Sequence, residues 1–275
     1  MPDISQLSIN LATIRMQGGL VELVEACARA GVPAVAPWRD QVAAAGLEVS
    51  ARAIRDAGLK VSGLCRGGMF PAATEEGRRA ADEDNRRAVD EAVALDAECL
   101  VLVVGGLPEG SRDIAGARQM VEDGIGRLLE HSRPAGMKLA IEPLHPMYAG
   151  DRSCVNTLGQ ALDMAGRLGA DVGTAIDAYH VWWDPDVTRQ IARAGRENRV
   201  FAYHICDWLV PTEHLLTDRG MMGDGVIDLQ GLRAMIEATG YAGFHEVEIF
   251  SAANWWKRPL DEVIATCIER HRDAS

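Results

Sequence analysis

The alternation of short β-forming runs with longer amphipathic stretches constrains the fold of this chain more than any other feature. Eight β-type runs lie at residues 7–12, 34–37, 60–64, 99–104, 138–142, 172–177, 200–206 and 244–250. Apolar residues recur at helical spacing in residues 20–30, 74–95, 114–132, 158–168, 229–239 and 260–272. Glycine repeatedly follows such a stretch, as it does at the C-terminal caps of helices. The pattern predicts repeated βα units around a parallel sheet.

The even spacing of these units favours a closed barrel over an open sheet. Eight units extend over ~250 residues, the usual length of a (β/α)8 barrel, and no linker rich in proline, glycine or serine separates them. The alternative is an open doubly wound sheet with a glycine-rich phosphate turn after its first strand, but residues 10–19 contain no such motif. We therefore expect one α/β domain, a single TIM barrel over residues 1–275.

The composition excludes several partners and locations. A formal net charge of -12 argues against a protein that grips nucleic-acid phosphates or an anionic membrane surface. No run reaches the ~18 apolar residues that span a bilayer, and the first residues do not resemble a signal peptide. The six cysteines are scattered without a C-x-x-C pair, so they signal neither a disulfide framework nor a cysteine zinc site. We expect a cytoplasmic protein with buried cysteines.

Ionisable residues end four successive β-type runs in the second half of the chain. They are Glu142, Asp177, His204 and Glu248, and an apolar residue precedes each of them. Because side chains alternate along a strand, these four would face the barrel axis while the preceding residues face the helices. Active-site residues of barrels project from the carboxyl ends of strands. Carboxylates this close together would repel one another, and a bound cation is the simplest compensation.

Three carboxylates and one imidazole form a mostly hard oxygen site with one borderline nitrogen. Such a site suits one divalent metal, for which we favour Mn²⁺, with Mg²⁺, Co²⁺ or Zn²⁺ as alternatives. The competing interpretation is that separate salt bridges or backbone donors satisfy each residue. Glu246 lies two residues before Glu248 and should point to the same face, so it either orients a ligand or replaces Glu248 as one.

At these positions the chain resembles the xylose-isomerase-like TIM barrels, a superfamily of sugar isomerases, ketose 3-epimerases, inosose dehydratases and related metal enzymes. The resemblance spans nearly the whole chain and rests on Ile141-Glu142-Pro143, Asp177-Ala178-Tyr179-His180, Tyr203-His204, Gly223-Asp224-Gly225 and Glu248-Ile249-Phe250. In the ketose epimerases the two metal-bound glutamates are the bases, which implies catalytic roles for Glu142 and Glu248. His180 matches a histidine that contacts the substrate in that family.

A narrower likeness concerns residues 142–148, which look like the α subunits of bacterial C-glycoside deglycosylating enzymes. Those enzymes cleave a C–C bond of a 3-oxo-glucoside, and a small all-β partner subunit completes them. The likeness implies that His145 is the general base and that such a partner binds this chain. Assembly into a homo-oligomer also stays open.

Six further side chains near the strand ends are candidates for proton transfer or substrate contact. They are His145, His180, Arg152, Arg219, Trp182 and Trp208. The two histidines each follow a proposed ligand by three residues, and an imidazole suits proton transfer near neutral pH. The arginines would hold a substrate oxygen, and the indoles would pack against a sugar ring or an aglycone. Solvated arginines and tryptophans at a protein interface are the alternatives.

These observations predict a metal-dependent enzyme that removes a proton α to the carbonyl of a keto-sugar or a 3-oxo-glycoside. Reprotonation would give isomerisation or epimerisation, and β-elimination would make the enzyme a lyase, as in inosose dehydratases or in C-glycoside deglycosylation. A non-catalytic metal-binding subunit is the alternative from another class. An apurinic endonuclease would need a basic groove and more histidines than the seven present. The absence of a glycine-rich phosphate cradle favours a non-phosphorylated substrate.

Overall fold

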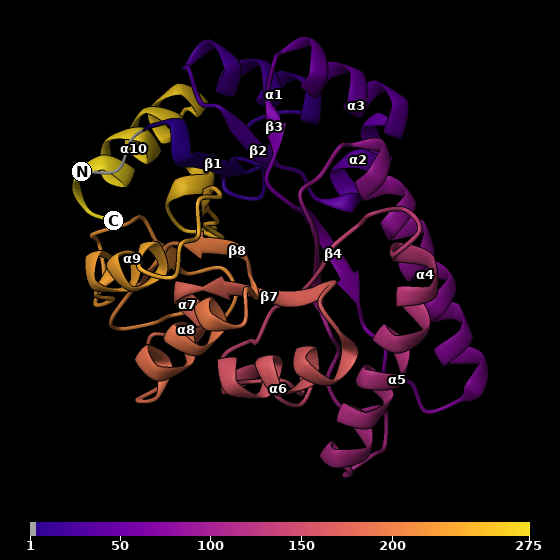
Figure 1. Ribbon diagram of the computed structural model, residues 1–275. Helices are drawn as coiled ribbons and strands as arrows, with labels where there is room; N and C mark the ends of the chain where they lie inside the picture. The colour runs from indigo at the N-terminus through magenta and orange to yellow at the C-terminus, as the bar shows by residue number, and fades with distance from the viewer. Residues whose placement is uncertain (1–3) are drawn as a thin grey trace.

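A computed structural model describes residues 4–275, so the first three residues of the predicted domain lie outside the described residues. Its main sheet contains only parallel pairs, in the order β3-β2-β1-β11-β8-β7-β6-β5-β4 (Figure 1). The strands are β1 (Leu7–Asn10), β2 (Ala34–Ala36), β3 (Lys60–Val61), β4 (Leu64–Gly68), β5 (Leu100–Val103), β6 (Leu139–Ile141), β7 (Val172–Asp177), β8 (Val200–Ile205) and β11 (His245–Val247).

Strands β3 and β4 occupy one strand position and close the sheet into a barrel. β3 pairs with β2 and β4 pairs with β5, and only two residues separate the two segments. Isolated parallel bridges complete the closure, since Val61 of β3 reaches Ala97 beside β5 and Cys65 of β4 reaches Trp38 beside β2. The eight predicted runs thus supply the eight strand positions, and the predicted (β/α)8 barrel is confirmed.

Helices alternate with the strands and surround them (Figure 1). They are α1 (Leu20–Arg29), α2 (Arg39–Ala45), α3 (Leu47–Asp56), α4 (Glu75–Ala94), α5 (Ile114–Ser132), α6 (Leu158–Leu168), α7 (Ala178–Val181), α8 (Val187–Arg196), α9 (Leu229–Glu237) and α10 (Leu260–Asp273). Each of the six predicted helical stretches forms a helix. Side-chain N-caps start four of them, because Thr74, Asp113, Thr157 and Asp228 each accept a hydrogen bond from the backbone N–H three residues on.

The sequence pattern missed α2, α3, α7 and α8 and ended the third strand too early. Gly46, at φ 91°, separates α2 from α3, so the apolar residues do not follow one helical period through residues 39–56. β4 continues to Gly68, four residues beyond the predicted end at residue 64, because Arg66 and the following glycines interrupt the apolar pattern.

The strands separate two apolar regions. A large core between strands and helices contains Ile141, Ile176, Tyr203 and Val247, the residues that precede the four predicted metal ligands. Inside the barrel the packed residues are small, namely Cys65, Cys99, Val101, Ala140, Ala175 and Ala202. The predicted alternation of side chains is therefore confirmed on these strands. The small residues leave room on the barrel axis for the polar side chains one step further along.

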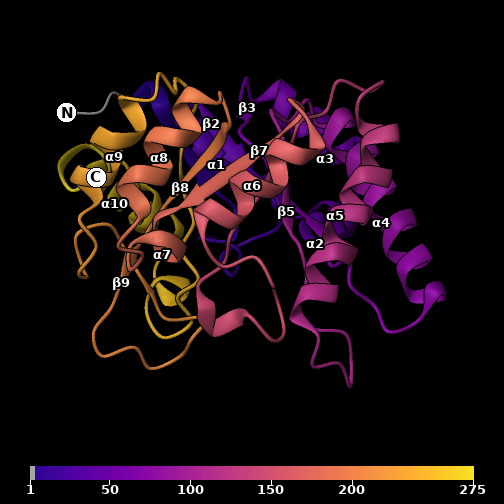
Figure 2. The same cartoon turned by 60° about the horizontal axis from the view of Figure 1, so that its bottom comes forward.

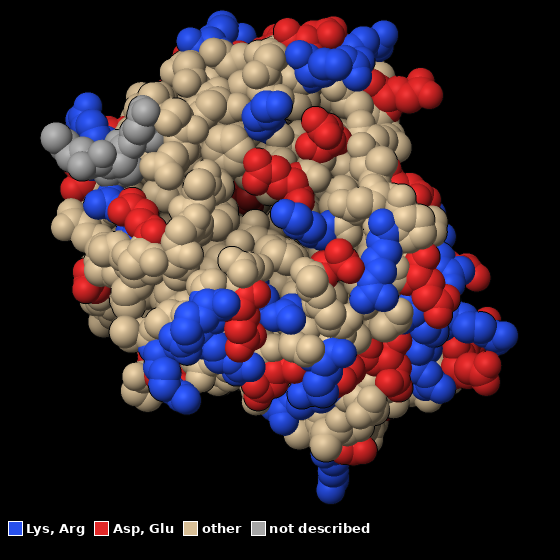
Figure 3. Space-filling view, in the orientation of Figure 1, with Lys and Arg blue, Asp and Glu red and all other residues tan. Residues whose placement is uncertain are grey.

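The loops that follow the carboxyl ends of the strands gather at the lower edge of Figure 2, with α7 and β9, while the N-terminus lies at the upper edge. One of these loops contains an antiparallel pair, β9 (Asp207–Trp208) and β10 (Arg219–Gly220). On the face in Figure 3, lysines and arginines are interspersed with aspartates and glutamates. Within residues 4–275, no helix is both long enough and apolar enough to cross a membrane. All six cysteines are free and buried, as predicted.

Candidate metal centre

Four side chains at the carboxyl ends of adjacent strands meet at one point. Glu142 follows β6, Asp177 ends β7, His204 lies in β8 and Glu248 follows β11. Each offers one ligand atom, and these atoms all lie within 4.8 Å of one another. All four residues are buried. The structure therefore brings together the four residues that the sequence singled out as metal ligands.

This set of donors fits a divalent cation. Ligands of one ion at ~2.1 Å lie up to about 4.2 Å apart, so small side-chain rotations would bring these atoms around one ion. Burial raises the pKa of Glu248 to about 7 and also raises the pKa of Asp177, because Arg219 and His204 offset only part of the desolvation. The buried carboxylates are thus short of positive charge. A bound cation would supply it.

Arg219 provides part of that charge from within the protein. Its Nη1 donates to Asp177 Oδ2 and to Glu248 Oε2, both at 3.0 Å, and its Nη2 lies 3.2 Å from His180 Nε2. The competing interpretation was that salt bridges within the protein satisfy each residue. Two of the three carboxylates, Asp177 and Glu248, do form such a salt bridge with Arg219. Among residues 4–275, the ion-pair partner of Glu142 is His204, at 3.1 Å, and no arginine reaches it.

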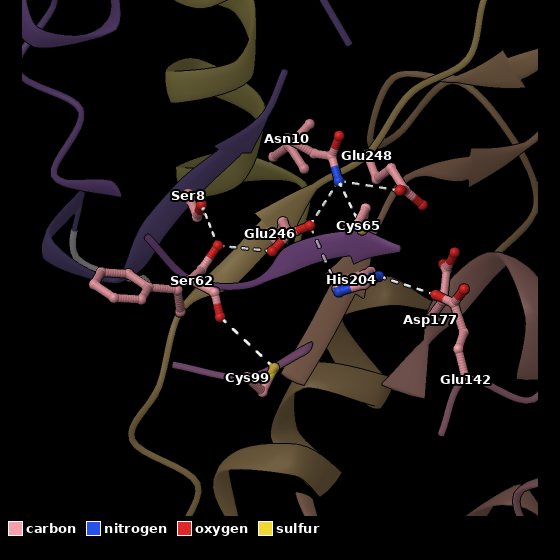
Figure 4. Close-up of polar contacts among 12 residues, drawn as sticks. Ser8, Asn10, Ser62, Cys65, Cys99, Glu142, Asp177, His204, Glu246 and Glu248 are labelled. Carbon is pink, nitrogen blue, oxygen red and sulfur yellow. Dashed lines mark hydrogen bonds and ion pairs between the residues drawn. The ribbon is translucent and has the colours of Figure 1, made fainter. Parts of the chain in front are cut away.

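Glu246 lies behind His204, inside a network of neutral donors (Figure 4). Its Oε1 accepts a hydrogen bond from Asn10 Nδ2 at 2.7 Å and lies 3.6 Å from His204 Nε2, while its Oε2 accepts from Ser62 Oγ at 2.7 Å. Asn10 Nδ2 also donates to Glu248 Oε1 at 3.0 Å. Burial alone lowers the pKa of His204, but the surrounding carboxylates raise it well above its usual value. Glu246 is therefore placed to orient the His204 ring through Nε2, which leaves His204 Nδ1 directed toward Glu142.

A second group of possible ligand atoms joins Cys65 to Glu246 and Glu248. Asn10 Nδ2 donates to both carboxylates and lies 3.8 Å from Cys65 Sγ, so the amide already engages all three. Burial raises the pKa of the Cys65 thiol well above its usual value. The group with Cys65 shares Glu248 with the group of four and offers one ligand fewer, so the group of four is the better candidate.

A cavity lies against the cluster, and its wall is both charged and apolar. The charged and polar wall residues are Glu142, Glu248, His180, Arg219, Arg66 and Arg152. The apolar and aromatic ones include Trp38, Leu144, Tyr148 and Phe250. Asp177 and His204 lie beneath this wall. Of the four candidate ligands, only the two glutamates therefore face the space that a substrate would enter.

His180 faces the cavity as a neutral ring. Its Nδ1 faces the backbone N–H of His145 and its Nε2 faces Arg219 Nη2, both at 3.2 Å; both neighbours are donors, and a neutral ring can accept from only one of them. Nε2 lies 3.6 Å from Asp177 Oδ2. Burial and the nearby Arg219 hold the pKa of His180 well below its usual value. The ring therefore lines the cavity as a neutral imidazole rather than as a cation.

Three of the predicted contact residues lie beside the cavity rather than in its wall. The His145 ring lies 5.0 Å from the ring of Trp208 and 5.5 Å from that of Trp183, and its Nδ1 accepts from Met147 N at 3.2 Å. Trp182 lies 5.6 Å from Trp208 in the same aromatic cluster. By contrast, the other predicted contact residues, His180, Arg152 and Arg219, belong to the wall.

Sequence reasoning missed the residues that the first half of the chain contributes. Asn10 ends β1, Trp38 lies two residues beyond β2 and Arg66 lies within β4, and Trp38 Nε1 donates to Asn10 Oδ1 at 2.8 Å. A polar residue inside the first β-type run was the signal for Asn10. Arg66 lies beyond the predicted end of its strand at residue 64, so alternation along the strand could not predict that its side chain faces the cavity.

Comparisons with solved structures agree with this fold. Protein SMc04130 from Sinorhizobium meliloti 1021 is 65% identical and superposes with a TM-score of 0.97 over 99% of each chain. The IolI protein, solved with a bound zinc atom, superposes with a TM-score of 0.83 over 98% of this chain and 97% of that one. At 21% identity, this second likeness shows the fold alone.

Sequence comparison adds a family and a group of curated relatives. The inosose isomerase of Halalkalibacterium halodurans is 28% identical over 146 residues, which are 52% of this chain and 49% of the relative. The match thus spans about half the length of that relative. The family model for xylose isomerase-like TIM barrels matches residues 24–267, most of the chain. With the barrel and the strand-end cluster in place, this match shows that the chain belongs to the xylose isomerase-like TIM barrel family.

Proposed function

We propose that this chain is a divalent-metal-dependent enzyme that removes a proton α to the carbonyl of a keto-sugar and returns it, as an isomerase or epimerase does. One observation carries the proposal. The cluster of Glu142, Asp177, His204 and Glu248 lies against a cavity that also presents a neutral imidazole and a guanidinium. A divalent ion held there would supply Lewis-acid polarisation of the substrate carbonyl. The name inosose isomerase, carried by a relative, belongs to the same reaction class.

The two glutamates of the cluster are the proposed bases. Glu142 and Glu248 both line the cavity, whereas Asp177 and His204 do not, so only the glutamates can reach a substrate C–H bond directly. His180 lines the same cavity, and as a neutral imidazole it would hydrogen-bond a substrate oxygen as negative charge develops there.

Arg219 is a proposed donor to the substrate. Its Nη2 faces His180, and its Nε has no hydrogen-bond partner within residues 4–275. A buried guanidinium with a free N–H is suited to hold a hydroxyl or a carbonyl oxygen. Binding the metal would also draw on the two carboxylates that Arg219 now bridges, which would release Nη1 for the substrate.

The identity of the metal and the fate of the carbanion are finer parts of the proposal. We propose Mn²⁺, because a set dominated by carboxylates suits a hard ion, and Zn²⁺ is the alternative that the zinc-bound IolI structure supports. Elimination in place of reprotonation would give an inosose-dehydratase-like lyase. Both outcomes begin with the same proton removal, so one experiment tests their common step.

A second candidate is a C–C lyase acting on 3-oxo-glycosides, with His145 as its base and a small β-type partner subunit. The observation in its favour is the half-buried His145 ring, which lies near Trp183 and Trp208. The indole faces would suit a flat aglycone. Burial lowers the pKa of His145, which keeps the ring neutral and able to accept a proton at neutral pH.

The test is proton–deuterium exchange, followed by NMR, on keto-sugars, inososes and 3-oxo-glycosides. The protein is stripped of metal and then reloaded with Mn²⁺. We expect exchange at one carbon of at least one substrate, only in the reloaded sample. Reloaded protein that holds metal but exchanges none of these protons would contradict an enzyme that acts alone and would favour a metal-binding subunit.

A further inference from the structure

Two arginines in the cavity wall have no part in the metal cluster. Arg66 lies in β4 and Arg152 in the loop after β6, and both line the cavity that also exposes Glu142 and Glu248. Arg66 also lines an adjoining, more open cavity, so its side chain lies at the junction between the two. The pair is therefore placed where a substrate would extend away from the cluster.

Neither guanidinium has a close partner in the protein. Among residues 4–275, no hydrogen bond or ion pair involves the side chain of Arg66, although it is about half-buried. The Arg152 side chain makes one long ion-pair contact, 3.9 Å from Asp151, and lies over the Tyr148 ring at 5.7 Å from its centre. The other arginines that line the adjoining cavity, Arg15 and Arg39, pair with carboxylates.

Neighbouring arginines show that carboxylates are available on this face but are used elsewhere. Arg39 in the adjoining cavity binds Asp84 at 2.8 Å and Glu91 at 2.6 Å, and Arg15 pairs with Asp40. An acidic chain with a net charge of -12 thus leaves one half-buried guanidinium unpaired beside its candidate active site. Burial and the nearby Arg152 lower the pKa of Arg66.

We infer that Arg66 and Arg152 form a subsite for an oxyanion on the substrate, either a carboxylate or a phosphate ester. The inference rests on the proposed function, because the substrate's carbonyl end would lie at the metal cluster. An anion between the two guanidiniums would replace their repulsion with two charge-assisted interactions. The substrate class is then an acidic keto-sugar rather than a neutral one.

A structural role for these two side chains is not supported by their contacts. Arginines that brace this fold donate to backbone carbonyls, as Arg118 does to Cys154 O at 2.8 Å and Arg78 to Ala72 O at 2.9 Å. The side chains of Arg66 and Arg152 make no such bond within residues 4–275. Their guanidinium donors are therefore left for a ligand.

The test uses anions that do not depend on sugar stereochemistry. Inorganic phosphate and acetate are titrated separately into the metal-free full chain, and the arginine Nε–Hε signals are followed by NMR. We expect saturable shifts of Arg66 and Arg152, with a Kd of about 1 to 10 mM, and unchanged signals from the exposed Arg55. Tighter phosphate binding would point to a phosphate ester, and tighter acetate binding to a carboxylate.

Variants separate the charge from the fold. Arg66→Gln should weaken binding of the preferred anion by about fivefold or more, Arg66→Lys should retain part of it, and Arg55→Gln should leave it unchanged. Thermal unfolding of each variant shows that the barrel is intact. Signals of Arg66 that do not shift with either anion up to about 50 mM, or equal binding by Arg66→Gln, would overturn the inference.

The two proposals can fail separately. Saturable anion binding at Arg66 in a protein that exchanges no substrate proton would keep the subsite and remove the proposed function. Metal-dependent exchange of neutral keto-sugars, with no anion binding, would do the reverse. If exchange occurs, Arg66→Gln should slow it about tenfold for an acidic substrate.

Discussion

The two halves of the barrel contribute different chemistry to the same cavity. Strands β6, β7, β8 and β11 end in carboxylates and an imidazole that lie within ligand distance of one another. In the first half, Asn10 ends β1, Trp38 lies two residues beyond β2 and Arg66 lies within β4, so these strands contribute an amide, an indole and a guanidinium. In this barrel the second half supplies the clustered carboxylates and imidazole, whereas the first half supplies neutral donors that bond to them and a guanidinium without a close partner.

The largest effect should follow from removing a ligand in the second half. Asp177→Asn keeps the shape of a side chain that does not face the cavity but removes its negative charge. We expect metal-dependent proton exchange to fall by about a thousandfold or more, with loss of bound metal measured by elemental analysis. The matched control is Asp171→Asn, at an exposed aspartate paired with Arg133. Full activity in Asp177→Asn would remove this residue from the metal site.

A change in the first half should act through the metal rather than on the chemistry. Asn10→Ala removes the donor that Glu246 and Glu248 share. We expect metal affinity to fall about 10- to 100-fold, followed by Mn²⁺ titration with electron paramagnetic resonance. At saturating Mn²⁺ the exchange rate should recover most of its normal value. An exchange rate that stays as low as in Asp177→Asn would contradict the distinction between the two halves. The control is Asn254→Ala, in an exposed loop, which should change neither the metal affinity nor the exchange rate.

The second half was predictable from the sequence because charged residues there interrupt otherwise apolar strands. Glu142 and His204 could be assigned to the barrel axis from alternation alone, and the structure places their apolar neighbours against the helices. The same reasoning gave eight strand positions and the closed barrel. Alternation along the strands gives no distances between side chains. It also could not predict that Arg219 bridges two carboxylates, because Arg219 lies in a long loop whose path no local sequence pattern encodes.

The first half was less predictable because its signals are weaker. β4 contains Arg66 and two glycines where an apolar run was expected, so the strand was ended too early and its arginine was not considered. Asn10 is a single amide in a short run, and amides occur at many strand ends. His145, Trp182 and Trp208 lie near strand ends as predicted, yet the packing of aromatic rings, which sequence does not reveal, holds them beside the cavity wall.

A buried side chain clamps the irregular end of β4. Asn85 of α4 accepts a hydrogen bond from Gly68 N at 2.6 Å and donates to Gly68 O at 2.8 Å, and it is fully buried. Asn85→Ala should therefore lower the free energy of unfolding by about 2 kcal/mol, measured by urea denaturation. Gln119→Ala, on the exposed face of α5, is the control. An unchanged stability would show that the clamp has no role in holding β4.

An effect that depends on pH should appear at the far end of β11, away from the cavity. Burial lowers the pKa of His245 to about 4, and its Nδ1 lies 3.1 Å from His271 Nε2. Because the unfolded histidine titrates near 6.5, the unfolded state gains a proton first as the pH falls. The contribution of His245 to stability is therefore complete above about pH 6.5 and falls as the pH drops toward 4, by about 2 kcal/mol at pH 5.

This pH dependence can be isolated by difference. His245→Gln should flatten the decline in unfolding free energy between pH 7 and about pH 5, relative to the parent protein, when urea denaturation is repeated at each pH. His214→Gln, at an exposed histidine, should keep the parent slope. Parallel curves for the parent and His245→Gln would show that another group governs the decline.

The central claim is that four strand ends form one metal site, and anomalous diffraction from crystals soaked in Mn²⁺ tests it most directly. The account predicts one strong anomalous peak at ~2.0 to 2.3 Å from oxygen or nitrogen atoms of Glu142, Asp177, His204 and Glu248. Continued bridging of Asp177 and Glu248 by Arg219, with no peak between the four residues, would contradict it.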